Sequence, residues 1–228
     1  MCYGCRLKKI NMRLLKKVLI VTGRIYLCSM LYALCSVCGL AANDCVQYKK
    51  NPNVAVRFPE WEKSVVRPLA PMDLLHGNVV ATFAEEYSLV VEADPVPGGF
   101  CVVLSGVDAS VGYTDFLVQI DSRHAPASCA YNVILEHEDL HIAAHLSVMD
   151  DFAGDIKRAV AAAANSVMPI FVSEGDGFDD ALDIMQMGLY SHPDIVLMKQ
   201  KIDAENAMRN KQIDMRADDR RVKKCLMD

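Results

Sequence analysis

The chain has 228 residues, of which 52% are hydrophobic and 23% charged. This length and composition indicate one globular domain or a small pair, and they exclude a low-complexity protein. All residues before Asp44 are neutral or basic; after residue 43 the chain holds 17 basic and 29 acidic residues, a net charge of −12. Such an acidic body repels phosphate groups, so nucleic acid is excluded as an expected partner.

The N-terminal segment has the layout of an export signal. A basic stretch precedes an uncharged apolar run over residues 25–42 that ends in small residues. We therefore predict a signal peptide over residues 1–42, starting at Met1 or Met12 and cleaved near Ala41 or Ala42. Residues 43–228 would then form a single periplasmic or secreted domain. The alternative is an uncleaved anchor in the inner membrane, and membrane contact is expected only in that case.

The cysteines agree with an oxidising compartment. Five of the nine lie in the predicted signal segment, and four remain after it: Cys45, Cys101, Cys129 and Cys225. An even number in an exported domain predicts two disulfides, and sequence alone leaves three pairings open. We favour Cys101–Cys129, which would join a strand to the start of a helix, and Cys45–Cys225, which would tie the two ends together.

The first half of the predicted domain reads as β-structure. Residues 43–81 contain several prolines and short apolar stretches, which favour strands or irregular structure. Three β-rich runs follow, at residues 87–91, 100–104 and 116–120. Residues 95–99 and a Gly/Ser/Asp-rich stretch separate these runs and predict turns in an antiparallel sheet.

The second half reads as helical. A helix is expected to open at residues 126–128 and to continue to about Asn165, because apolar residues recur there at spacings of three and four. A second helical region runs from about Asp179 towards Arg221, with an interruption at Pro193. We therefore predict an α+β fold in which a small antiparallel sheet packs on a long helix, followed by a helical C-terminal region.

The long predicted helix carries an H-E-x-x-H motif at residues 137–141. His137 and His141 are four residues apart, so both imidazoles lie on one helix face and can reach the same zinc ion. Zinc lowers the pKa of water to about 7, and Glu138 is placed to accept the proton as a general base. The motif therefore predicts a zinc cofactor and hydrolytic chemistry. The alternative is an amphipathic helix whose histidines are packed and hydrogen-bonded.

The third ligand is left open by the sequence. His145 lies about 12 Å from His137 along a regular helix, too far to bind the same ion, so we expect it to support His141 or to line the cleft. A ligand from the second helical region, such as Glu205, would copy the layout of the gluzincins. The full set of candidates is His124, Asp150, Asp151, Asp155, Glu174, Asp176, His192 and Glu205.

Residues 133–141 resemble the active-site helix of zincin metallopeptidases. The preceding segment 128–131 and the late segment 211–214, followed by Val222 and Cys225, are similar to a group of secreted bacterial proteins regarded as zinc proteases. Those proteins pair a short β-sheet with an H-E-x-x-H helix and a helical C-terminus. The resemblance covers about residues 100–225. It implies zinc on His137 and His141 and a catalytic role for Glu138.

These observations give a leading expectation and an alternative. We expect an exported zinc-dependent hydrolase, a metallopeptidase acting on protein or peptide substrates. The alternative is a non-catalytic envelope protein that uses the same helix to bind metal or to dock a partner. Metal binding without peptide hydrolysis would favour the alternative.

Overall fold

The computed structural model describes residues 45–67, 76–215, 221, 224 and 225. The predicted signal peptide or anchor at residues 1–42 lies outside these residues. Among the described residues, no helix combines the length and the apolar character needed to cross a bilayer.

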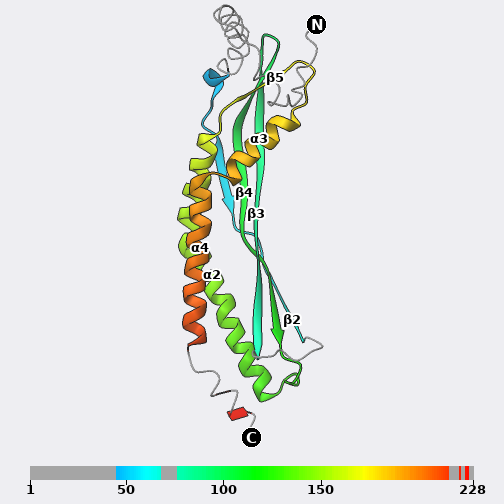
Figure 1. The fold of residues 1–228 in the computed structure, drawn as a ribbon, viewed down its shortest axis with the longest axis vertical. Coiled ribbons are helices and arrows are strands. Elements are labelled where there is room, and N and C mark those ends of the chain that lie inside the picture. The colour runs from blue at the N-terminus through cyan, green and yellow to red at the C-terminus, as the bar shows by residue number, and fades with distance from the viewer. Residues whose placement is uncertain (1–44, 68–75, 216–220, 222–223, 226–228) are drawn as a thin grey trace, which may run out of the picture. The chain divides into compact units, whose positions relative to one another are not determined.

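The described strands form one sheet around a long central strand (Figure 1). β4 (Gly99–Ile120) pairs along its whole length with antiparallel β3 (Gly77–Val96). Three short strands follow one another along its other side. These are β5 (Ile170–Ser173), β1 (Asn53–Arg57) and β2 (Glu62–Val66).

The prediction of a small antiparallel sheet is wrong. β1 and β2 both run parallel to β4, whereas β3 and β5 run antiparallel to it, so the sheet is mixed. The reason is that residues 53–66, whose pattern left strands or irregular structure open, supply two strands that pair with β4 in the same direction, although the β3–β4 hairpin follows them in the sequence. Their alternation of residue types does not encode the direction of the partner strand.

The predicted turn between residues 104 and 116 is also absent, because β4 continues through it. Its glycines serve close packing within the sheet. A Cβ atom on Gly112 would lie 2.9 Å from Cδ of Pro59, and one on Gly106 would lie 3.3 Å from the backbone oxygen of Asn53. The predicted turn at residues 95–99 does form, with Gly98 at a φ of +84° in the hairpin that joins β3 to β4.

Three helices follow the hairpin. α2 (Cys129–Ser166) begins after Ser128, whose hydroxyl accepts a hydrogen bond from the backbone N–H of Tyr131 and so caps the helix. α3 (Asp179–Tyr190) and α4 (Pro193–Asp214) come after β5, and Pro193 stands at the first position of α4, where its missing N–H costs nothing. Figure 1 shows α2 and α4 side by side, and the buried faces of α2 and the sheet share one hydrophobic core.

Two disulfides join the four predicted cysteines, which confirms their number, but both predicted pairings are wrong. Cys45 pairs with Cys101, and Cys129 pairs with Cys225. Cys101 lies near the start of β4, about 60 Å along an extended strand from Ile120, beyond which α2 begins. Cys129 is therefore at the opposite end of β4, where the returning C-terminal segment supplies Cys225.

Candidate metal site

Two rows of polar side chains face each other across α2 and α4. α2 carries His137, His141 and His145, and α4 carries Asn206, Asn210 and Asp214, each row at a spacing of four residues. This spacing places each row on one face of its helix. The helices run antiparallel, so the end of α4 meets the start of α2. We call these six residues the polar ladder.

The outer end of the ladder brings three potential ligand atoms together. Nε2 of His141 lies 3.1 Å from Nε2 of His137 and 3.1 Å from Oδ1 of Asp214. Nε2 of His137 lies 3.4 Å from the same carboxylate oxygen. Both imidazoles are largely buried, whereas the side chain of Asp214 is 62% exposed, so the cluster opens to solvent on the α4 side.

This triangle fits a tetrahedral metal ion. Ligand atoms at 2.0–2.1 Å from a tetrahedral zinc lie roughly 3.3–3.4 Å from one another, close to all three observed separations. Two imidazoles and one carboxylate are also a ligand set of catalytic zinc sites, which keep the fourth position open. Moreover, Asp214 is the last residue of α4, where the helix dipole disfavours a carboxylate and a bound cation would offset that cost.

Glu138 lies beside the cluster in a buried position, with 4% of its surface exposed. It packs against the start of β3, because a Cβ atom added to Gly77 would lie 2.5 Å from Oε1 of Glu138. Burial raises the pKa of the Glu138 carboxyl, and the nearby His141 and His137 oppose that rise. The carboxylate is therefore close enough to interact with both histidines while remaining outside the ligand triangle.

His145 lies one rung further along the ladder, within a hydrogen-bonded chain. Its Nδ1 lies 3.1 Å from the hydroxyl of Tyr113 on β4, and its Nε2 lies 3.3 Å from Nδ2 of Asn210. Oδ1 of Asn210 in turn lies 2.9 Å from Nδ1 of His141. Burial lowers the pKa of His145, which favours the neutral ring. The residue thus connects to His141 through Asn210.

The candidates for a third ligand all lie elsewhere. Several form side-chain contacts away from the cluster. His124 contacts His76, for example, while Asp151 and Glu205 both pair with Arg209. The only three-residue group of potential ligands in the described part of the chain consists of His137, His141 and Asp214. The remaining candidates, which are not part of it, are Asp150, Asp155, Glu174, Asp176 and His192.

Asp214, Asn206 and Asn210 were missed as site residues. A signal for them exists in the sequence, because N-x-x-x-N-x-x-x-D at residues 206–214 has the same spacing as H-x-x-x-H-x-x-x-H at residues 137–145. Matching polar spacing on two helices predicts facing rows only if the helices are already known to pack antiparallel.

Comparison of the chain with protein-family models, curated proteins and solved structures gives no match. The function must therefore be argued from the site itself.

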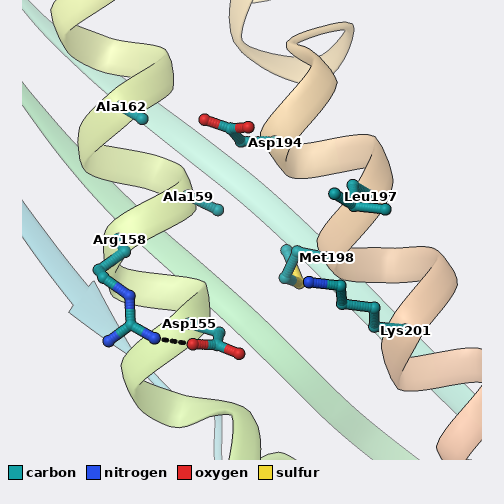
Figure 2. A pocket seen from close by; sticks show the side chains of 8 residues that line it. All are labelled: Asp155, Arg158, Ala159, Ala162, Asp194, Leu197, Met198 and Lys201. Carbon is teal, nitrogen blue, oxygen red and sulfur yellow. Dashed lines mark hydrogen bonds and ion pairs between the residues drawn. The ribbon is translucent and has the colours of Figure 1, made fainter.

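A separate groove of about 380 Å³ lies between the second half of α2 and the first half of α4 (Figure 2). Asp155 lines it and pairs with Arg158 of the same helix, so this candidate ligand is engaged away from the cluster of His137, His141 and Asp214. Ala159, also in the groove, is 18 residues beyond His141, about 27 Å along the helix. The groove and the cluster are distinct places on the same helix pair.

Proposed function

We propose that this protein is a zinc-dependent peptide hydrolase, with His137, His141 and Asp214 as ligands and Glu138 as the general base. The observation that carries the proposal is the ligand triangle of 3.1, 3.1 and 3.4 Å beside a buried glutamate. Neither the ligand triangle nor the buried glutamate would suffice alone, because histidine pairs and buried carboxylates both occur as structural features.

Each residue has a defined task in this proposal. A zinc ion supplies Lewis acidity, which lowers the pKa of water and polarises a carbonyl group. Glu138 takes the proton from the attacking water and returns it to the leaving amine. The exposed position of Asp214 leaves the cluster accessible to a substrate.

The sheet supports a peptide as the substrate class. Among the described strands, β3 pairs only with β4, so its other edge has no strand partner in this part of the chain. The first residue of β3, Gly77, contacts Glu138. An extended peptide that added to this edge as a further strand would pass close to the base.

Metal analysis of the protein from residue 43 onwards tests the proposal. We expect close to one zinc per chain, lost in His141→Ala and strongly weakened in Asp214→Asn. Asp150→Asn is the matched control, because it makes the same charge change at an exposed position of α2 outside the triangle. Absence of zinc uptake by the parent protein would refute the proposal. Zinc uptake without peptide hydrolysis would instead identify a non-catalytic metal-binding protein.

A further inference from the structure

We infer that Asn210 is a positioning residue, whose amide fixes the ring of His141 for metal binding and ties it to the sheet. This inference rests on the proposed metal site, and not on hydrolysis. Asn210 stands at the middle rung of the polar ladder, between the ligand triangle on one side and His145 on the other.

The first step concerns the two nitrogens of His141. Oδ1 of Asn210 lies 2.9 Å from Nδ1 of His141, and an amide oxygen can only accept a hydrogen bond. Nδ1 must then carry the proton, which leaves the lone pair on Nε2. That nitrogen is the one directed at His137 and Asp214. Asn210 thus selects the tautomer that can bind a metal ion through Nε2.

The second step concerns the orientation of Asn210 itself. Its Nδ2 donates to Nε2 of His145, at 3.3 Å, and Nδ1 of His145 donates to the Tyr113 hydroxyl, at 3.1 Å. That hydroxyl also accepts a hydrogen bond from Nδ2 of Asn206, at 2.8 Å. In this arrangement Nδ2 of Asn210 and Nδ1 of His145 each meet an acceptor, which agrees with Oδ1 of Asn210 facing His141.

The third step concerns the end at which this chain of hydrogen bonds is anchored. Tyr113 belongs to β4, and both Tyr113 and Asn206 are buried, whereas Asp214 at the other end is exposed. The order along the ladder therefore runs from a buried interior to an exposed proposed metal site. Without Asn210, His141 would lose its only link to this interior anchor among the contacts that the described residues show.

Two substitutions at Asn210 separate positioning from packing. Asn210→Ala removes the acceptor for His141, and we expect zinc affinity to fall about 10- to 100-fold. Asn210→Asp keeps an acceptor oxygen but loses the donor to His145, so affinity should return to within a few-fold of the parent. Gln212→Ala, at an exposed position of α4, is the matched control and should bind zinc as the parent does.

Zinc affinity would be measured by competition with a chromogenic chelator, together with the melting temperature of each metal-free variant. ¹⁵N NMR of the metal-free parent should show a proton on Nδ1 of His141, because Oδ1 of Asn210 selects that tautomer before any metal ion binds, and a purely structural role would not require it. Wild-type affinity in a folded Asn210→Ala protein, or a proton on Nε2 of His141, would overturn the inference.

The design also handles variants that fold poorly and distinguishes the two proposals. If Asn210→Ala does not fold, the NMR signature of the parent and the affinity of Asn210→Asp still decide the question. An Asp variant that binds zinc 10-fold more weakly than the parent would contradict the inference. If the parent takes up no zinc at all, the metal site and this inference both fail. If the parent binds zinc and Asn210→Ala binds it equally well, only the role of Asn210 is lost.

Discussion

The same pair of helices is apolar at one end and polar at the other. In its second half, α2 buries Ile156 and Val160, which share a core with Ile195, Met198 and Ile202 from the first half of α4. In the opposite halves the contact includes the polar ladder and the hydrogen bonds of Arg209 to Ser147 and Asp151. Both ends belong to one antiparallel packing of α2 and α4 (Figure 1).

The difference separates the apolar residues that hold the two helices together from the polar residues that could bind a ligand. Full burial of one aliphatic side chain stabilises the folded state by about 1.5–3 kcal/mol. An internal hydrogen bond stabilises it by a net of about 0.5–1.5 kcal/mol. The apolar half is therefore the stronger source of docking free energy. The polar half adds less stability, and it contains the three residues that we propose as metal ligands.

Glu138→Gln should give the largest effect. It should remove the proposed activity of the polar half without affecting the packing of the apolar half. The amide cannot accept a proton, so peptide turnover should fall about 10²- to 10⁴-fold while zinc content stays unchanged. Turnover of an unstructured peptide mixture is the measurement, with Asp139→Asn as the control at the adjacent exposed carboxylate. A Gln variant that turns over substrate like the parent would rule out Glu138 as the base.

Ile202→Ala should destabilise the apolar half and leave the proposed metal site of the polar half unaffected. Ile202 is 1% exposed in the shared core, and its truncation should lower the free energy of unfolding by about 2–5 kcal/mol. Chemical denaturation of the metal-free protein measures this loss. Zinc affinity of the folded protein should stay within about threefold of the parent. A tenfold weaker affinity would mean that the two halves are coupled.

Gly77→Ala should disturb the polar half from the sheet side. The added Cβ atom would lie 2.5 Å from Oε1 of Glu138 and 2.6 Å from Cγ2 of Ile134, so we expect a loss of about 1–3 kcal/mol in stability and a lower turnover. Gly188→Ala is the control, because a Cβ atom there meets nothing within 4 Å and should stabilise α3. Equal stability of the two variants would contradict the close contact at Gly77.

The smallest expected effect is the contribution of the polar half to the pH dependence of stability. Burial lowers the pKa of His145 in the folded state, so the folded protein binds fewer protons than the unfolded chain. The associated stability is present above the unfolded pKa of about 6.5 and is lost as pH falls below it. Melting temperatures of the metal-free protein between pH 7.5 and 5 should therefore decrease, and less steeply in His145→Gln. Identical slopes of melting temperature against pH in the parent and in His145→Gln would exclude His145 as a source of the pH dependence. Glu138, whose pKa is raised, acts in the opposite direction in both proteins.

The sequence by itself determined the features that depend on neighbouring residues. The start of α2 follows from the capping hydroxyl of Ser128, and the shared face of His137 and His141 follows from their spacing of four. The presence of two disulfides follows from four cysteines in the predicted exported part. In each case the physical cause lies within a few residues or in the composition.

Only the tertiary structure decided which distant partners meet. Asn210 is 69 residues from His141, and Cys225 is 96 residues from Cys129, so neither contact has a local signal. Parallel pairing of β1 and β2 with β4 likewise depends on how the chain returns to the sheet. The proposed third ligand, Asp214, reaches His137 and His141 because α4 packs antiparallel on α2. That packing is set by the apolar core at the other end of the helix pair, far from the residues whose chemistry it brings together.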